Sequence, residues 1–261
     1  VLCSKGGMTG EPVGPGGALQ RVIDGRPASL RRHVEESLKR LGTDRIDVYY
    51  LHRWDRSVPI EDSVGEMARA VGRGDVRAIG LSEVSAATLR RAHAEHPIAA
   101  LQSEYSPWSR EPEIGALAAC KELGIAFVAF SPVGRGALTA RPPEMSALDA
   151  GDIRRSMPRF MGAQWEQNQD LLAGFRRLAA VGGRTPAQLA LAWLLARGEH
   201  VLPIPGTTRL EHLHENLAAA DRPLDADTVA AVDRLLPAGR AAGGRYAAAS
   251  QSEVDTERFP G

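Results

Sequence analysis

The chain contains 261 residues, of which 43% are hydrophobic and 25% are charged, and this composition is sufficient for the core of one large α/β domain. Lysine plus arginine and aspartate plus glutamate number 32 each, so the charge balance favours neither a nucleic-acid-binding protein nor a membrane-surface protein. The sequence shows no signal peptide and no apolar run near the roughly 20 residues that cross a bilayer, and its two cysteines form no metal-ligand pattern, so we expect a cytoplasmic protein without a metal site.

Six short apolar runs alternate with amphipathic helical segments along the chain. The predicted strands are Val1–Ser4, Ile46–Leu51, Val76–Leu81, Ile98–Leu101, Ile125–Phe130 and Val201–Ile204. The predicted helices are Ser29–Leu41, Glu61–Arg73, Ala86–Glu95, Pro112–Leu123, Ala187–Arg197, Glu211–Ala220 and Asp225–Leu235. Ser85 and Thr185 are the expected N-caps of two of these helices. Strands that alternate with helices in this way predict parallel βα units and an α/β barrel.

Three stretches depart from this alternation. Gly10–Gly17 is rich in glycine and proline and is predicted to be a loop; it does not join a strand to a helix, so it is not a dinucleotide fingerprint. Thr139–Gln167 is either a lid over a cofactor or substrate or a disordered segment, and its position after a strand favours the lid. The small, weakly patterned residues near the C-terminus predict a barrel domain over 1–236 and a mobile or loosely packed tail over 237–261.

Polar residues directly follow five of the predicted strands. They are Lys5, His52, Ser82, Gln102 and Ser131. A lysine after a strand is often only the first solvated residue, and a single histidine is more often structural than catalytic. Barrel active sites, however, are built from residues at the carboxyl ends of the strands. The five residues together therefore predict an active-site rim.

Five sequence blocks, in this order, resemble the aldo-keto reductase family. The blocks are Ile46–Asp55, Gly80–Glu83, Leu101–Ser106, Phe130–Gly136 and Ile204–Thr208. The resemblance runs from residue 1 to about 236 and is strongest to the bacterial and plant branch related to potassium-channel β subunits. It implies a (β/α)8 TIM-type barrel that binds NADP(H) and reduces a small-molecule carbonyl substrate. We expect the chain to hold six of the eight βα units, with the first two missing.

The resemblance assigns catalytic roles to Lys5 and His52. The family uses a tyrosine as general acid, a lysine and an aspartate that tune it, and a histidine that orients the carbonyl. A lysine ammonium lowers the pKa of a neighbouring phenol from about 10, and a neutral histidine donates a hydrogen bond to the carbonyl oxygen. The family aspartate and tyrosine precede the lysine strand, and Asp47, Tyr49 and Tyr50 do not match their positions.

The resemblance also implies a cofactor site. Ser82 and Gln102 match ligands of the nicotinamide carboxamide, although Glu83 stands where many relatives carry asparagine. Phe130 either stacks on the nicotinamide ring or is a core aromatic. The residues expected along the pyrophosphate are Ser131, Pro132, Gly134, Arg135 and Gly136.

The residues after the last predicted strand match the adenosine end of the cofactor site. The expected phosphate ligands at this helix start are Gly206, Thr207, Thr208 and Arg209. Arg209 either binds the 2′-phosphate or is a rim arginine without a ligand, and His212 stands where some relatives carry arginine. Glu215 and Asn216 match adenine ligands. Trp54 and Trp108 line a substrate pocket or are packing residues.

Two hypotheses for the function follow. The first is an NADPH-dependent reductase whose N-terminal part is missing from this sequence. The second is an NADP(H)-binding or interaction protein that has lost catalysis. The predicted strands Val1–Ser4 and Val201–Ile204 are apolar and carry no edge protection, which favours a sequence selected for a closed barrel and therefore the first hypothesis.

Overall fold

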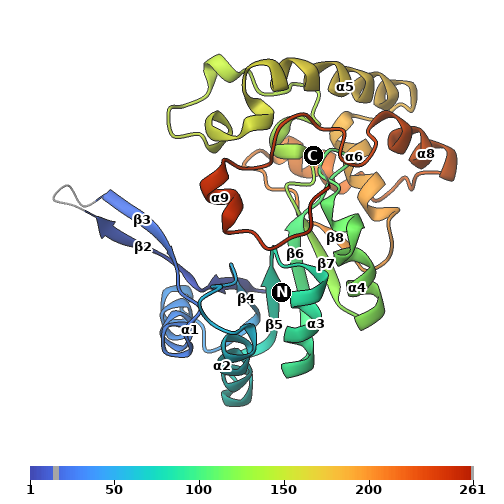
Figure 1. Cartoon of the computed structure of the whole chain (residues 1–261). Helices are drawn as coiled ribbons and strands as arrows, with labels where there is room; N and C mark the ends of the chain where they lie inside the picture. Colours follow the sequence, from blue (N-terminus) through green and yellow to red (C-terminus); the bar gives the residue numbers. More distant parts are fainter. Residues whose placement is uncertain (14–17, 260–261) are drawn as a thin grey trace. The chain divides into compact units, whose positions relative to one another are not determined.

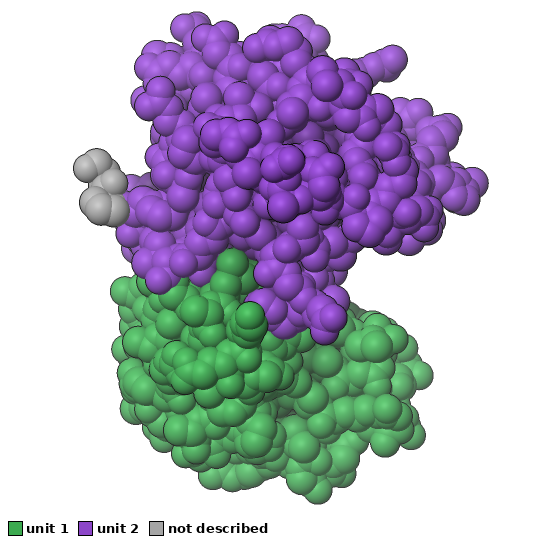
Figure 2. All heavy atoms as spheres, turned by 90° about the vertical axis from the view of Figure 1, so that its right-hand side faces the viewer, with its two compact units in different colours: residues 1–103, 115–127, 253–257 green, residues 104–114, 128–252, 258–261 purple. Residues whose placement is uncertain are grey.

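The computed structural model describes residues 1–13 and 18–259, and these form two compact units (Figure 2). Unit 1 consists of Val1–Ser103, Gly115–Phe127 and Glu253–Glu257. Unit 2 consists of Glu104–Ile114, Val128–Ser252 and Arg258–Gly261. None of the helices among the described residues is both long enough and apolar enough to cross a membrane.

Unit 1 is built on parallel strands with helices packed against them (Figure 1). The strands are β1 (Cys3–Gly6), β4 (Ile46–Leu51), β5 (Val76–Ser82) and β6 (Ile98–Glu104), whose last residue belongs to unit 2. The helices are α1 (Pro27–Leu41), α2 (Ile60–Arg73), α3 (Ala86–Glu95) and α4 (Ala116–Leu123). Ile46, Ile79 and Leu101 are fully buried in this unit. Strands covered in this way read as continuous apolar runs, which is why they can be located from the sequence.

Unit 2 contains the remaining strands and most of the later helices. Its strands are β7 (Ala126–Phe130), which begins in unit 1, and β8 (Val201–Pro203), and its helices are α5 (Gly162–Val181), α6 (Pro186–Leu195), α7 (Leu210–Leu217), α8 (Ala226–Leu235) and α9 (Ala248–Ser252). The amide of Ile204 donates to the carbonyl of Ala129 at 3.0 Å, which joins β8 to β7. Helix α6 is buried on opposite faces, because Leu189 and Trp193 on one side and Leu191 on the other are all nearly inaccessible.

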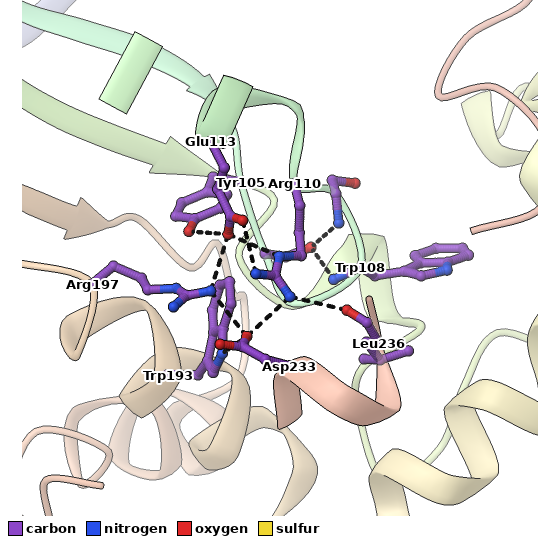
Figure 3. Close-up of polar contacts among 10 residues, drawn as sticks. Tyr105, Trp108, Arg110, Glu113, Trp193, Arg197, Asp233 and Leu236 are labelled. Atoms are coloured by element: carbon purple, nitrogen blue, oxygen red, sulfur yellow. Dashed lines mark hydrogen bonds and ion pairs between the residues drawn. The ribbon is translucent and has the colours of Figure 1, made fainter. Parts of the chain in front are cut away.

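A network of partly buried charged side chains lies within unit 2 (Figure 3). Arg110 binds Glu113 at 2.8 Å and Asp233 at 3.0 Å. Arg197 binds the same two carboxylates, at 3.1 and 2.9 Å. The Trp193 indole donates to Asp233 at 3.0 Å. Each carboxylate is shared by two guanidinium groups, so the partly buried charges of this network are compensated by its own members.

All six predicted strands are confirmed, and they belong to one six-stranded sheet in the order β1-β4-β5-β6-β7-β8. The fold class is therefore α/β with a parallel sheet. The described residues form an open sheet and no closed barrel. The prediction of six βα units in an incomplete barrel is therefore confirmed only as an α/β fold with a six-stranded parallel sheet.

The predicted loop over Gly10–Gly17 is wrong in its first part. Met8–Val13 (β2) and Ala18–Ile23 (β3) form an antiparallel hairpin in which Met8 pairs with Ile23. Residues 14–17, which include the glycine motif rejected as a dinucleotide fingerprint, lie outside the described residues. The glycines and proline conceal the strands because β-structure depends on pairing partners more than on intrinsic propensity.

Two further parts of the chain differ from expectation. Helix α5 is not predicted from the sequence, and its first residues fall within the segment assigned to a lid. The tail is not loosely packed throughout, because Arg245 and Val254 are nearly fully buried. Asp255 accepts hydrogen bonds from the amide and hydroxyl of Ser85, both at 3.1 Å, so the tail caps the start of α3.

Candidate active site

Lys5 and His52 lie at the carboxyl ends of the neighbouring strands β1 and β4. Lys5 pairs in register with Tyr50, and the amide of His52 continues the ladder by donating to the carbonyl of Gly6 at 2.8 Å. The predicted placement of both residues at one end of the sheet is confirmed. Lys5 Nζ donates to Gln102 Oε1 at 2.6 Å, although β4 and β5 lie between their strands. The sheet of unit 1 is thus curved enough to bring side chains of β1 and β6 together.

Burial and positive charge set the protonation of this rim. Burial lowers the pKa of Lys5, and the nearby Arg53 guanidinium lowers it further. Burial also lowers the pKa of His52 to about 4, with smaller contributions from Arg53 and Lys5. His52 is therefore neutral near pH 7, the form that the predicted role requires. In that form the ring carries one N–H donor.

Arg53 is a rim residue that lies within one of the family-like sequence blocks but has no role assigned from the sequence. Its Nη1 donates to the His52 carbonyl at 2.7 Å and to Ser82 Oγ at 3.1 Å, so it joins the ends of β4 and β5. The signal in the sequence is its position directly after His52. Ser82 and Gln102 are buried and pair in register on β5 and β6.

The two tyrosines of β4 are committed to the core. Tyr49 is fully buried and shares a 3.3 Å hydrogen bond with Ser37. Tyr50 is also buried, which raises its pKa to about 12, and its hydroxyl is hydrogen-bonded to Gln102. Their burial agrees with the absence of a predicted catalytic role for either residue.

A cavity of about 1050 Å³ lies within unit 2, between the residues after β7 and the start of α7. Most residues predicted to bind the cofactor in this unit line it. These are Ser131, Pro132, Arg135, Gly136, Gly206, Thr207, Thr208, Arg209, His212, Glu215 and Asn216. Phe130 and Gly134 are not among the described residues that line it. The volume lies just above the range of about 300–1,000 Å³ that is typical of ligand sites.

The loop after β7 that lines this cavity has an unusual backbone. Ser131 and Arg135 have φ values of 50° and 54°, which non-glycine residues rarely adopt. Gly134 and Gly136 lie in the same region at 58° and 93°. A Cβ at Gly134 would lie 3.2 Å from the Trp108 ring, so glycine also serves close packing there. Strained residues of this kind cluster at ligand clamps.

The segment predicted to be a lid also borders the cavity. Thr139, Ala140, Arg141 and Arg154 line it, and Arg154 Nη1 donates to the carbonyl of Arg135 at 3.2 Å. Arg154 is held by Asp152 at 2.6 Å, and this pairing lowers the pKa of Asp152 to about 2. These contacts favour the lid over the alternative of a disordered segment. The sequence predicts that this segment is a lid, but it assigns no role in the site to any of these side chains.

Arg209 at the start of α7 already has an anionic partner. Its guanidinium binds Glu211 at 2.7 Å, and both side chains are well exposed to solvent. The amide of Arg209 donates to Thr207 Oγ1 at 3.1 Å, which fixes the turn that opens the helix. A phosphate at this helix end would meet Arg209 and the amides of the first turn. It would also compete with Glu211 for the guanidinium.

The aromatic candidates are placed mainly by packing. Trp108 is buried and meets Phe160 edge-on at 5.4 Å, which favours the packing interpretation. Trp54 donates its indole N–H to the Val58 carbonyl at 3.0 Å, and Arg91 lies 5.8 Å from its ring. Among the described residues, no group of three or more histidine, cysteine, aspartate or glutamate side chains is arranged to hold a metal ion.

The comparison with protein families matches the model described as the Aldo/keto reductase family over residues 2–237. The match begins at residue 2 and therefore does not support the expectation that two N-terminal βα units are missing. The chain is 40% identical over 247 residues to aldo-keto reductase str7 of Strobilurus tenacellus, covering 94% of this chain and 74% of that protein. It is also 40% identical over 243 residues to aldo-keto reductase yakc [NADP(+)] of Schizosaccharomyces pombe, covering 91% and 72%.

Two solved structures are similar in fold. A glycerol dehydrogenase from Gluconobacter oxydans aligns with a TM-score of 0.81 and 23% identity, covering 98% of this chain and 74% of that chain. A thermostable aldo-keto reductase in complex with the inhibitor epalrestat aligns with a TM-score of 0.64 and 30% identity, covering 80% and 67%.

Proposed function

The chain belongs to the aldo/keto reductase family, and we propose that it is an NADP(H)-dependent reductase that converts a small aldehyde or ketone to the alcohol. The observation that carries the proposal is the gathering of the predicted cofactor residues around one cavity in unit 2. A relative at 40% identity is named for NADP(+), which supports the choice of cofactor.

The residues around the cavity suit a dinucleotide with three phosphate groups. Arg141, Arg154 and Arg209 line it, and the α7 N-terminus adds amide donors. Under the proposal, Arg209 binds the 2′-phosphate, the loop from Ser131 to Gly136 follows the pyrophosphate, and Glu215 and Asn216 hold the adenine. Ser82 and Gln102 would hold the carboxamide.

The proposed chemistry divides between the cofactor and the rim of unit 1. When bound, the cofactor would supply the hydride. Neutral His52 would donate a hydrogen bond to the substrate carbonyl oxygen, the Lys5 ammonium would stabilise the negative charge that develops on it, and a proton taken up from solvent would complete the alcohol. Arg53 binds the His52 carbonyl and Ser82, so it keeps both residues in position.

The second candidate function is NADP(H) binding without carbonyl reduction. The observation that favours it is that both tyrosines of β4, Tyr49 and Tyr50, are buried and hydrogen-bonded. A missing general acid typically costs about 10²–10⁴-fold in rate. In that case the cavity of unit 2 would retain its ligand while turnover is lost.

One protein sample distinguishes the two functions. NADPH is titrated by fluorescence, and reduction of 4-nitrobenzaldehyde is followed in the same sample. Saturable binding with turnover supports the reductase, and saturable binding without turnover supports the second function. Absence of NADPH binding by the folded chain would overturn both.

A further inference from the structure

Arg135 lines the cavity of unit 2, yet its guanidinium is bound to protein groups. Its Nη2 atom lies 3.0 Å from the Tyr246 hydroxyl and 3.4 Å from Glu104 Oε2. The guanidinium also lies over the Tyr246 ring, 5.5 Å from its centre. Tyr246 comes from the C-terminal tail, 111 residues further along the chain.

The Glu104 carboxylate lies at the centre of a buried cluster of arginine side chains. It lies at the end of β6 with 2% of its side chain exposed, and it accepts a 2.8 Å hydrogen bond from Ser109. Besides Arg135, it faces Arg159 and Arg245, each at 3.6 Å. Burial by itself raises the pKa of Glu104, but Arg245, Arg159 and Arg135 together lower it, so this carboxylate is charged.

The backbone of Arg135 explains why these anchors matter. Gly134, Arg135 and Gly136 are three consecutive residues with positive φ, and only Arg135 carries a side chain that disfavours this conformation. Its carbonyl accepts the bond from Arg154, and its side chain is held by Glu104 and Tyr246. The turn is therefore held through both the backbone carbonyl and the side chain of Arg135. Such a conformation persists only when the surrounding structure over-determines it.

We infer that Tyr246 and Glu104 are positioning residues of the cofactor site, which hold the strained Gly134–Arg135–Gly136 turn in the shape that receives the pyrophosphate. The inference rests on the proposed function and deepens it. It also gives part of the C-terminal tail a role in ligand binding. Arg135, which lines the cavity, then acts mainly as the anchor of the loop.

The test compares two tyrosine-to-phenylalanine variants of the full chain. Tyr246→Phe removes the hydroxyl bound to Arg135 and keeps the ring beneath the guanidinium. Tyr105→Phe is the matched control, because the Tyr105 hydroxyl also binds a charged group, Glu113 at 2.7 Å, away from the described cavity lining. Each variant is titrated with NADPH and with adenosine 2′,5′-bisphosphate, which contains no pyrophosphate.

We expect Tyr246→Phe to weaken NADPH binding about five- to tenfold, the equivalent of the net contribution of one ordinary hydrogen bond. Its affinity for adenosine 2′,5′-bisphosphate should stay within about twofold of the unmodified chain. Tyr105→Phe should leave both affinities unchanged, even where it lowers the melting temperature as much as Tyr246→Phe does.

Three outcomes would overturn the inference. They are unchanged NADPH affinity in Tyr246→Phe, equal weakening for both ligands, or equal weakening in both variants. Failure of the unmodified chain to bind NADPH would instead overturn the proposed function. Glu104→Gln is the second variant, and its circular dichroism spectrum is compared with that of the unmodified chain to check that it folds. When folded, it should also weaken the binding of NADPH but not that of adenosine 2′,5′-bisphosphate. Full NADPH affinity in this variant would contradict the role of Glu104.

Discussion

The titratable groups at the rim of unit 1 and the Arg209–Glu211 ion pair at the cavity of unit 2 differ in how far they are buried. At the rim, Lys5 and His52 are partly buried, and burial is the main cause of their lowered pKa values. At the cavity, Arg209 and Glu211 form an ion pair that is well exposed to water. A buried group has its protonation fixed before a substrate arrives, whereas an exposed pair can exchange its partner at low cost. The first arrangement suits chemistry, and the second suits reversible binding of a charged ligand.

The largest effect is expected from His52→Gln. If His52 orients the carbonyl oxygen, loss of this donor should lower kcat about 10²–10³-fold. The dissociation constant of NADPH should change less than twofold, because His52 lies outside the cavity lining. Steady-state kinetics and fluorescence titration measure the two quantities, and His96→Gln, at the end of α3 and outside the cavity lining, is the control. Retention of full kcat in His52→Gln would remove His52 from the mechanism.

Arg209→Gln should have the next largest effect, and on binding alone. Loss of one charge-assisted contact with a 2′-phosphate should weaken NADPH about 10–100-fold, while NADH affinity stays constant. Arg32→Gln, on an exposed face of α1, is the control for a general loss of positive charge. Equal weakening of both cofactors would show that Arg209 does not recognise the 2′-phosphate.

The partly buried His52 predicts a pH dependence of stability. Its pKa is about 4 in the folded chain and about 6.5 when unfolded, so the unfolded state takes up the proton first as pH falls. The stabilisation is present above pH 6.5 and is lost between pH 6.5 and 4. Allowing for the partial exposure of His52, we expect it to contribute about 1–2 kcal/mol to the free energy of unfolding. Urea unfolding at a series of pH values should show a shallower slope for His52→Gln; an unchanged slope would contradict this account.

Glu211→Gln should have the smallest effect, and it acts in the opposite direction to Arg209→Gln. Removing the carboxylate frees Arg209 and eliminates repulsion of a phosphate, so NADPH affinity should rise about two- to fivefold. NADH affinity should not change. A loss of NADPH affinity would show that Glu211 holds Arg209 in its binding position instead of competing for it.

The strands and their terminal residues can be predicted because each carries a local signal. Ile46–Leu51 has the predicted bounds, since all of its residues except Asp47 are apolar or aromatic. The helix Ala86–Glu95 also has the predicted bounds, because the Ser85 hydroxyl caps it by accepting from Thr88 at 3.2 Å. The cavity residues after β7 and β8 are found because each group belongs to one short sequence motif.

The features that are missed depend on partners distant in sequence. The β2–β3 hairpin is defined by pairing across its turn, and α5 begins at Gly162 without a side-chain cap. Nothing near Arg135 in the sequence indicates Tyr246, because their contact forms only in the folded unit. Arg154 reaches the cavity from a segment whose 3-10 turns carry no regular periodicity.

The charged network inside unit 2 has a consequence for how the chain folds during synthesis. Arg110 donates to the carbonyl of Leu236, which is 126 residues away, and Arg197 reaches Glu113 across 84 residues. Contacts of such sequence separation form slowly because a long loop must close first. Arg110 therefore remains hydrated and cannot form these contacts until α8 has been translated. Unit 2 thus acquires this network only after α8 has been translated, and a nascent chain that stops before Asp233 should remain without it.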